Sequence, residues 1–279
     1  MTFSLVLCTI NRTDELARFL ESLGRQTHRD YELVIVDQNT DDRLVPVLGA
    51  FRPATRIVYL RSAPGLTRGR NVALGRISGD VVAFPDDDCW YPDDLLQRVS
   101  ARLQENHNWD GLTGVLVDDP GRPKPDMDKE PGLLTRKNVW RRGNSNSIFL
   151  RSSVTAAVGR FDETLGPGAA SPWWAGDETD YLLSAIEKGF RIYYVPTIRV
   201  YHPWGPPYST DRLKRIYHYV AGMGRVLRKH RYPALYVLCR YFLRITAGIV
   251  IAVLRGDRNK AVYRWVEVKA LFRGYVVGA

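Results

Sequence analysis

The chain has 279 residues, a net charge of +10, 45% hydrophobic residues and 25% charged residues. This composition is typical of a folded globular protein and excludes a largely disordered chain, and the length predicts one large domain with or without an appendage. The three cysteines, Cys8, Cys89 and Cys239, are far apart and lack the spacing of a metal-binding motif. We therefore expect reduced thiols and a cytoplasmic protein, and the first residues show no signal peptide.

Short, nearly continuous apolar runs are typical of strands that are buried on both faces, and the runs between them are typical of crossover helices. We therefore predict an α/β fold with a mostly parallel central sheet flanked by helices. The predicted strands in the first part of the chain are Phe3–Ile10, Tyr31–Val36, Arg56–Leu60 and Asp80–Phe84. One helix is predicted to begin at Thr13, and three more are predicted over about Asp42–Phe51, Leu66–Ile77 and Leu95–Asn106.

The middle of the chain has shorter elements and two loops. Pro, Gly and charged residues mark Asp119–Pro131 as a loop and Gly166–Pro172 as a second, flexible loop. The predicted strands here are Leu112–Asp118, Asn146–Leu150, Arg191–Val195 and Ile198–His202, and the predicted helices are Ser152–Val158 and Asp177–Lys188.

The positive charge is concentrated in the C-terminal quarter. Residues 205–279 contain 4 Lys and 11 Arg against 2 Asp and 1 Glu, a net charge of +12, so residues 1–204 carry −2. Apolar residues recur at helical spacing from Ser209 to Pro233 and again over Asn259–Phe272. We therefore expect basic amphipathic helices with a task of their own.

Basic side chains interleaved with Tyr, Trp and Leu suit the surface of an anionic membrane, which we favour as a partner of these helices. Packing against the rest of the chain or a homo-oligomer is the alternative, and nucleic acid is disfavoured because no recognised nucleic-acid-binding fold is present. The run Ala234–Leu254 is very apolar, but Arg240 and Arg244 interrupt it. Its uncharged piece, Ile245–Leu254, is too short for a membrane-spanning helix of about 20 residues.

Three consecutive carboxylates, Asp86, Asp87 and Asp88, follow the predicted strand Asp80–Phe84 and precede a helix start at Pro92. Open α/β sheets bind ligands at the carboxyl ends of their strands. Adjacent negative charges repel one another, and a divalent cation with oxygen ligands, shared with a substrate phosphate, would neutralise them. A solvated turn that caps the next helix is the alternative.

Several motifs occur in an order and spacing that resemble family 2 glycosyltransferases with the GT-A fold. The resemblance covers about residues 3–203. It implies a Rossmann-like GT-A catalytic domain at 1–204, with a nucleotide-sugar half at 1–118 and an acceptor half at 119–204, followed by a helical extension at 205–279. The motifs of the first half are Cys8–Arg12, Val36–Asp37, Gly65–Asn71 and Asp86–Asp88, and those of the second half are Gly159–Glu163 and Gly176–Asp180.

The resemblance implies a role for individual residues around the nucleotide. Asp37 would hydrogen-bond the base or the ribose, because a carboxylate at the end of a strand can accept from an N–H or a hydroxyl. A turn residue is the alternative for Asp37, and a surface charge is the alternative for Arg68. The residues expected to contact the nucleotide or its pyrophosphate are Thr9, Asn11, Arg12, Asp37, Arg68 and Asn71.

In the acidic turn, the family pattern implies that Asp86 faces the ribose and that Asp88 binds Mn²⁺ or Mg²⁺ bridging the diphosphate. Asp87 lies between them and would meet the donor sugar. His202 follows the last predicted strand and would join the metal shell, where an imidazole favours manganese somewhat. A structural histidine is the alternative for His202.

Asp177, Glu178 and Asp180 are carboxylates at a predicted helix start. In the family this segment reads Glu-Asp and its second acid is the catalytic base, so the resemblance implies Glu178, with Asp177 and Asp180 as alternatives. The base takes the proton of the acceptor hydroxyl during attack on the anomeric carbon, and a single displacement inverts that centre. Trp173 and Trp174 would form a wall for the acceptor sugar or belong to the core.

Together these features predict an inverting glycosyltransferase, a hexosyl- or deoxyhexosyl-transferase that depends on Mn²⁺ or Mg²⁺. It would use a nucleoside-diphosphate sugar, with UDP preferred and dTDP and GDP open, and a lipid-linked or polysaccharide acceptor at the inner face of the cell membrane. A nucleotidyltransferase acting on sugar phosphates would need a glycine-rich, lysine-bearing loop, which Thr9–Asp14 lacks. A non-catalytic membrane-associated scaffold is the remaining alternative, and the intact sets of carboxylates argue against it.

Overall fold

The computed structural model describes residues 1–279 except for 52–55, 119–120, 126, 204–212 and 278–279. Contacts within the chain divide it into two compact units. The first unit consists of Met1–Phe161 and Tyr181–Trp204, and the second consists of Asp162–Asp180 and Gly205–Ala279. The division predicted from sequence fell after residue 204, whereas the contacts also group Asp162–Asp180 with the C-terminal residues.

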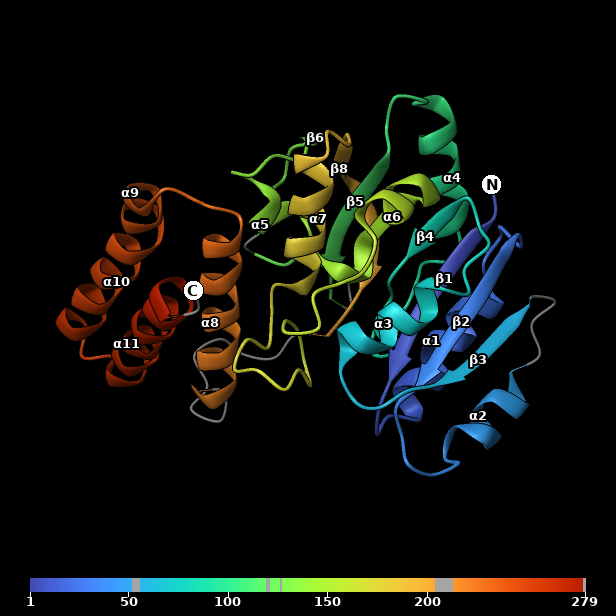
Figure 1. The fold of residues 1–279 in the computed structure, drawn as a ribbon, viewed down its shortest axis with the longest axis horizontal. Coiled ribbons are helices and arrows are strands. Elements are labelled where there is room, and N and C mark those ends of the chain that lie inside the picture. Colours follow the sequence, from blue (N-terminus) through green and yellow to red (C-terminus); the bar gives the residue numbers. More distant parts are fainter. Residues whose placement is uncertain (52–55, 119–120, 126, 204–212, 278–279) are drawn as a thin grey trace. The chain divides into compact units, whose positions relative to one another are not determined.

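The first unit is built on an eight-stranded sheet in the order β3-β2-β1-β4-β7-β5-β8-β6 (Figure 1). Neighbouring strands are parallel except where β7 pairs with β4 and β5 and where β6 pairs with β8. The mostly parallel α/β sheet expected from sequence is therefore confirmed. The strands are β1 (Phe3–Thr9), β2 (Tyr31–Asp37), β3 (Ile57–Arg61), β4 (Val81–Ala83), β5 (Gly111–Val117), β6 (Gly132–Leu133), β7 (Ile148–Arg151) and β8 (Ile192–Tyr201).

Helices flank this sheet, and every residue of β1, β2 and β5 is buried. Burial on both faces is the reason why these strands are nearly continuous apolar runs. Two of the helices connect neighbouring parallel strands, one between β1 and β2 and the other between β2 and β3, as the crossover pattern predicted. The helices of this unit are α1 (Asp14–Gly24), α2 (Leu44–Ala50), α3 (Leu66–Leu74), α4 (Leu95–Glu105), α5 (Val139–Arg142), α6 (Ser152–Val158) and the larger part of α7 (Asp177–Glu187), with a 3₁₀ turn, η1, at Ser145–Ser147.

The prediction of two late strands, Arg191–Val195 and Ile198–His202, was wrong, because β8 is one continuous strand. Its pairing with β5 shifts register between Thr113 and Val115. The intervening residue is Gly114, where a Cβ would overlap the carbonyl oxygen of Ile198 and lie 2.8 Å from its Cγ2. A glycine in β5 thus lets β8 bulge toward it and continue.

Smaller differences have local causes. Helix α3 ends at Leu74, three residues before the predicted end, and Gly75 follows as its C-cap residue with a φ of −76°. The two-residue strand β6 and the four-residue helix α5 were not predicted, since elements this short show no periodicity. The predicted loop Asp119–Pro131 lies partly outside the described residues.

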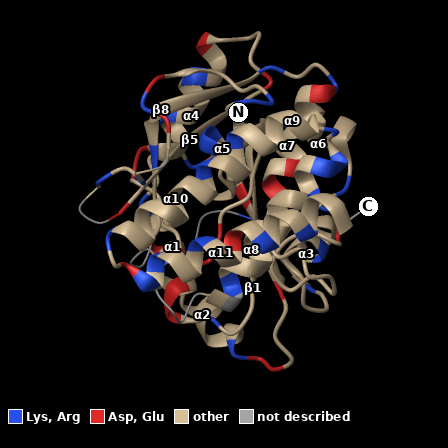
Figure 2. Cartoon of the chain, turned by 90° about the vertical axis from the view of Figure 1, so that its left-hand side faces the viewer, with Lys and Arg blue, Asp and Glu red and all other residues tan. Residues whose placement is uncertain are grey.

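The second unit contains the helices α8 (Leu213–Lys229), α9 (Ala234–Val237), α10 (Leu243–Leu254) and α11 (Arg258–Phe272). Two π-helical stretches, η3 (Leu238–Phe242) and η4 (Arg273–Val277), continue α9 and α11. Helix α11 packs against both α8 and α10. Lys and Arg side chains are spread along α8 and α11 (Figure 2), as the predicted basic helices require.

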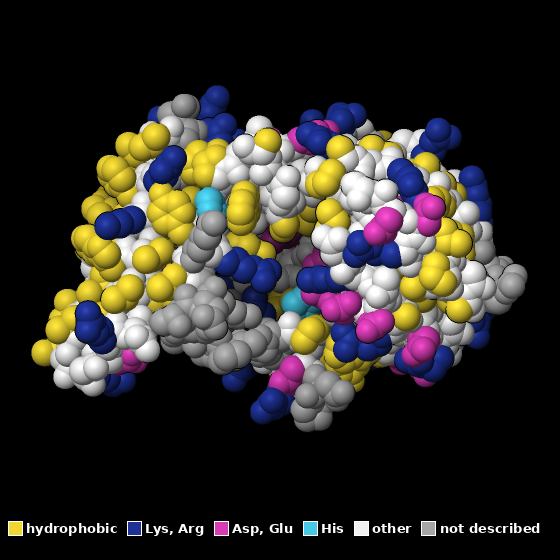
Figure 3. Space-filling model, turned by 90° about the horizontal axis from the view of Figure 1, so that it is seen from below, with side chains coloured by type: hydrophobic (Ala, Val, Ile, Leu, Met, Phe, Trp, Pro, Cys, Tyr) yellow, Lys and Arg dark blue, Asp and Glu magenta, His cyan; other side chains and the backbone are white. Residues whose placement is uncertain are grey.

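Ala234–Leu254 forms one helical segment of 21 residues that continues through Arg240 and Arg244. Within the described residues this segment alone is long and apolar enough to cross a membrane, a test that core helices and signal sequences also pass. The prediction considered only the uncharged run of ten residues, Ile245–Leu254, and therefore underestimated the length of this helical segment. Only 11% of the most apolar 18-residue stretch of this segment is buried. At the left of the view in Figure 3, the surface of the C-terminal helices shows many hydrophobic side chains with basic side chains between them.

Candidate active site

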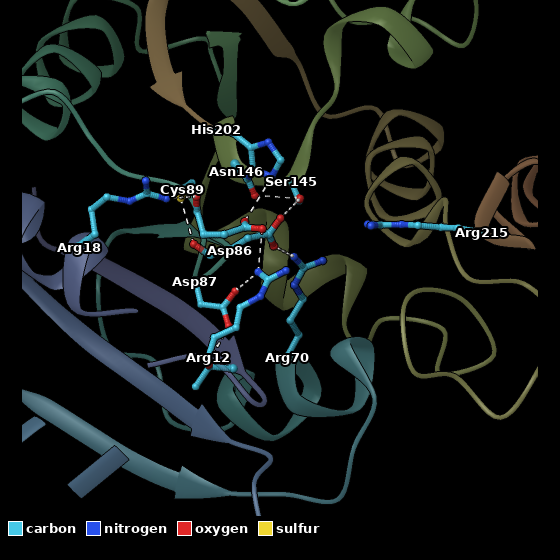
Figure 4. A network of polar contacts seen from close by, with 12 residues as sticks. Arg12, Arg18, Arg70, Asp86, Asp87, Cys89, Ser145, Asn146, His202 and Arg215 are labelled. Carbon is cyan, nitrogen blue, oxygen red and sulfur yellow. Dashed lines mark hydrogen bonds and ion pairs between the residues drawn. The ribbon is translucent and has the colours of Figure 1, made fainter. Parts of the chain in front are cut away.

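The carboxylates Asp86, Asp87 and Asp88 lie in the turn after β4, at the carboxyl edge of the sheet (Figure 4). Asp86 forms an isolated bridge with Cys8 of β1, and Trp90 forms one with Tyr201 of β8. The rings of Trp90 and Tyr201 stack with centroids 5.3 Å apart. The acidic turn is therefore held between the carboxyl ends of β1 and β8, where open α/β sheets bind ligands.

Asp87 faces the protein and ties the turn to the end of β1. Its Oδ2 accepts a hydrogen bond of 2.7 Å from Oγ1 of Thr9, and its Oδ1 lies 2.5 Å from Nη1 of Arg12. The Asp87 side chain is only 8% exposed, and burial raises its pKa despite these two partners. Asp87 thus fixes Arg12 and the turn relative to each other.

Asp88 lies between an arginine and a histidine. Its Oδ2 is 2.7 Å from Nη1 of Arg12, and its Oδ1 is 3.3 Å from Nε2 of His202, which follows β8. Burial would raise the pKa of Asp88, but His202 and Arg12 outweigh burial and hold this pKa below its usual value. Oδ1 is buried and accepts no hydrogen bond from any residue that the structure describes.

Asp86 lies beside a buried arginine that sequence reasoning missed. Nη2 of Arg70, a residue of α3 that is 1% exposed, is 3.4 Å from Oδ1 of Asp86. Oγ of Ser145 is 3.5 Å from Oδ2 on the other side. Burial raises the pKa of Asp86 to about 6, although Arg70 acts in the opposite direction. Figure 4 shows Arg12 and Arg70 on one side of the carboxylates and Ser145 and His202 on the other.

The residues of this site fit a divalent cation. Asp86, Asp88 and His202 each offer one ligand atom, and these atoms lie within 4.8 Å of one another. Oδ1 of Asp88 is buried and faces Nε2 of His202 without a hydrogen bond, so its lone pairs are available to a cation. Two carboxylates suit magnesium or manganese, and an added imidazole suits manganese better. The structure thus brings together the two residues predicted to bind the metal, Asp88 and His202, and adds Asp86, which was predicted to face the ribose.

Asp37, at the end of β2, is completely buried and already fully engaged. Its Oδ1 accepts from the main-chain N and the Nδ2 of Asn39 at 2.8 and 2.7 Å, and its Oδ2 accepts from the hydroxyl of Tyr59 at 2.5 Å. Oδ1 of Asn39 in turn accepts from the main-chain N of Asn11 at 2.7 Å, and Asn11 has a φ of 59°. Asp37 therefore shapes the loop after β1 through Asn39.

The structure shows protein contacts for two of the residues predicted to contact the nucleotide, Asn71 and Arg68. The amide of Asn71 exchanges two hydrogen bonds with the main chain of Phe161, at 3.0 and 2.7 Å, which gives it a structural role here. Arg68 is exposed, and its Nη1 lies 3.4 Å from the carbonyl oxygen of Pro64. Arg70, and not Arg68, is the arginine of α3 that faces the acidic turn.

The predicted acceptor residues lie in the second unit, in the segment Asp162–Asp180, which we call the acceptor loop. Asp177 and Asp180 at the start of α7 are buried, whereas Glu178 is half-buried. Trp173 and Trp174 are also half-buried. Among the three candidate bases, Glu178 is thus the one with an accessible side chain.

A family model described as glycosyl transferase family 2 matches residues 4–155, which is more than half of the chain. The chain belongs to glycosyl transferase family 2. The match includes β1, the acidic turn and β7, but it ends before the acceptor loop and His202. The glycosyltransferase predicted from the motifs is thereby confirmed at the level of the family.

Several proteins with similar sequences are described as glycosyltransferases. YwdF of Bacillus subtilis, an uncharacterized glycosyltransferase, is 29% identical over 105 residues, which are 37% of this chain and 39% of that protein. A PGL/p-HBAD biosynthesis glycosyltransferase of Mycobacterium bovis is 29% identical over 168 residues, 57% of this chain and 63% of that protein. The chain therefore spans less than two thirds of the length of either relative.

Solved structures confirm the GT-A fold with C-terminal helices. Residues 1–349 of TarS from Staphylococcus aureus, in complex with UDP-GlcNAc, align with a TM-score of 0.60 and 19% identity over 96% of this chain and 90% of that one. The mannosyltransferase PcManGT from Pyrobaculum calidifontis, in complex with GDP-Man and Mn²⁺, aligns with a TM-score of 0.67 and 14% identity over 99% and 87%.

Proposed function

We propose that this protein is an inverting, metal-dependent glycosyltransferase that uses a nucleoside-diphosphate sugar, with UDP as the preferred nucleotide. The observation that carries the proposal is the cluster of Asp86, Asp88 and His202 with its unbonded buried oxygen at the carboxyl edge of the sheet. The solved relatives bound to UDP-GlcNAc and to GDP-Man with Mn²⁺ support a nucleotide-sugar donor and a divalent ion.

On the donor side, Asp86, Asp88 and His202 would hold Mn²⁺ or Mg²⁺, which when bound neutralises the departing diphosphate. Arg12 and Arg70 lie next to these carboxylates and keep the site from carrying an uncompensated negative charge. The other proposed donor contacts are those implied by the family: Thr9 and Asn11 for the nucleotide, Asp37 for base or ribose, Arg68 for the pyrophosphate, Asp86 for the ribose and Asp87 for the sugar. Asn71 would not take part directly, because both atoms of its amide bond the main chain of Phe161.

On the acceptor side, Glu178 would take the proton of the acceptor hydroxyl as the oxygen attacks the anomeric carbon. The partial exposure of Glu178 supports this role. Asp177 is buried, and both carboxylate oxygens of Asp180 are already engaged, one by the ammonium group of Lys229 and one by the imidazole of His230. Trp173 and Trp174, on the same loop, would line the acceptor sugar. One displacement inverts the anomeric centre and needs no second acid.

For the acceptor we propose a lipid-linked or polysaccharide chain, with the C-terminal helices on the inner face of the cell membrane. Exposed apolar side chains and exposed arginines share α10 and α11, which suits an anionic bilayer better than a neutral one. The protein should sediment with vesicles containing phosphatidylglycerol and not with phosphatidylcholine alone. A stable homodimer that binds neither kind of vesicle would show that these helices pair with a second copy of the chain and not with a membrane. The most exposed apolar side chains of α10 and α11 are Leu254, Val253, Val250 and Leu243.

Donor binding is tested by thermal unfolding with UDP-GlcNAc or GDP-mannose, each with Mn²⁺ or with EDTA, because a ligand of the folded state raises the unfolding temperature. We expect a rise with one donor that requires Mn²⁺ and is lost in Asp88→Ala. Asp93→Ala removes an exposed carboxylate five residues away and should behave like the wild type. If the donor raised the unfolding temperature of the wild type and of Asp88→Ala equally, with EDTA in place of Mn²⁺, the metal assignment would be refuted.

A further inference from the structure

The acceptor loop is closed at its base by one side chain of α8. Nζ of Lys229 lies 2.8 Å from Oδ2 of Asp162 and 2.9 Å from Oδ2 of Asp180. Asp162 is the first residue of the loop and Asp180 is the last. A single ammonium group therefore joins the two ends of a loop of 19 residues, although the lysine itself lies 49 residues beyond Asp180 in sequence.

The remaining atoms of this cluster are also engaged. Nε2 of His230 lies 2.8 Å from Oδ1 of Asp180, so both oxygens of that carboxylate have a partner from the end of α8. Oδ1 of Asp162 accepts from the main-chain N and the hydroxyl of Thr164 at 2.9 and 2.6 Å. The side chains of Asp180 and His230 are 6% and 4% exposed. Bonds to charged groups that are this well buried are strong and directional.

Helix α8 contacts the loop along much of its length. The ring of His218 stacks on Trp174 with centroids 4.1 Å apart, and its Nδ1 lies 3.0 Å from the carbonyl oxygen of Pro172. Gly222 lies so close to the loop that a Cβ there would overlap the carbonyl oxygen of Ala175 and lie 2.9 Å from its nitrogen. Helix α8 thus supports the middle of the loop, and the ammonium group of Lys229 joins its two ends.

The proposed base is attached directly to this support. The main-chain N of Asp180 donates to the carbonyl oxygen of Gly176 at 2.7 Å and forms the first turn of α7, which contains Glu178. Holding Asp180 therefore holds the turn from which Glu178 projects. Just outside the loop, in the first unit, the rings of Phe161 and Tyr181 stack with centroids 4.0 Å apart.

We propose that Lys229 and His230 are positioning residues that hold the acceptor loop closed and thereby orient Glu178 toward the acceptor hydroxyl. The proposal rests on the proposed function only in taking Glu178 as the base. It assigns a part in catalysis to the end of α8, a helix that lies outside the region matched by the family. Loss of Lys229 should slow turnover and leave donor affinity unchanged, because the donor residues lie elsewhere.

Hydrogen exchange tests the closed loop without reference to activity. Lys229→Met should speed exchange of the amides of residues 163–179 by at least tenfold and leave those of β1 and β5 unchanged. Lys188→Met, the same substitution at an exposed lysine just after α7, is the matched control and should change neither region. Unchanged exchange in the loop of Lys229→Met would overturn the proposal. If that variant does not fold, His230→Gln takes its place with the same two outcomes.

Turnover tests the link to catalysis. With whichever of UDP-GlcNAc and GDP-mannose supports transfer, Lys229→Met should lower kcat by up to about 100-fold at unchanged donor KM, since a misplaced catalytic group costs that much. Lys229→Arg keeps the charge and should recover part of kcat. A loosened loop with wild-type kcat would refute the positioning role. If neither donor supports transfer even by the wild type, the proposed donor function fails, and the exchange experiment still decides whether Lys229 closes the loop.

Discussion

Replacing Asp162 by Asn should lower the free energy of unfolding by about 2 kcal/mol at pH 7. Burial alone would raise the pKa of Asp162, but hydrogen bonds from Lys229 and Thr164 outweigh burial and bring this pKa to about 2, against an ordinary value of 3.8. One unit of pKa displacement corresponds to about 1.4 kcal/mol, so the ionised carboxylate stabilises the folded state by about 2 kcal/mol. An asparagine keeps the shape and loses this contribution.

The sign of the effect determines its pH dependence. Because the folded state has the lower pKa, the stabilisation is fully present above the unfolded pKa and is lost as the pH falls through 2. From these two pKa values, about half of it should remain at pH 3. Urea unfolding of the wild type and of Asp162→Asn at pH 7, 5 and 3 measures the difference.

The exposed carboxylate of Asp93 provides the control for this experiment. Asp93→Asn should change stability by less than about 0.5 kcal/mol at each pH, because surface pairs contribute little. Equal stability of the wild type and Asp162→Asn at pH 7, or a difference that is just as large at pH 3, would refute the account of the Lys229 cluster.

Three further substitutions test other parts of the structure. Glu178→Gln should lower kcat by about 100-fold or more with donor affinity unchanged, because a general base contributes that much, and wild-type turnover would move the base elsewhere. Gly114→Ala should lower the unfolding temperature by several degrees, since a Cβ overlaps Ile198 and overpacking costs about 1–3 kcal/mol. Thr9→Val removes the hydroxyl that bonds Asp87 and should cost about 2 kcal/mol by urea unfolding; no loss would show that this bond is weak.

Much of the fold was predictable because burial leaves a direct mark on sequence. Strands such as β1 and β2 are buried on both faces, so each is a nearly continuous apolar run. The same logic predicted that the acidic turn after β4 would lie at the carboxyl edge of the sheet, and the resemblance to the family implied that His202 would join Asp88 there. The structure places their ligand atoms together.

Other features depend on contacts that no local pattern encodes. Arg68 and Arg70 are both on α3, and only the packing of that helix decides which of them faces Asp86. The sequence does not show that the amide of Asn71 is engaged, because its hydrogen-bond partner is the main chain of Phe161, which lies 90 residues away in sequence. Lys229 pairs with residues from a distant segment, so its part in closing the acceptor loop had no sequence signal.

The central claim is that the acidic turn and His202 bind a divalent cation, and direct titration with Mn²⁺ tests it. Electron paramagnetic resonance in the presence of UDP should show one saturable ion in the wild type and in the control Asp93→Asn. Asp88→Asn, which removes one charged ligand, should weaken that binding by at least about tenfold. Absence of a saturable ion in the wild type, or equal affinity in Asp88→Asn, would contradict the account.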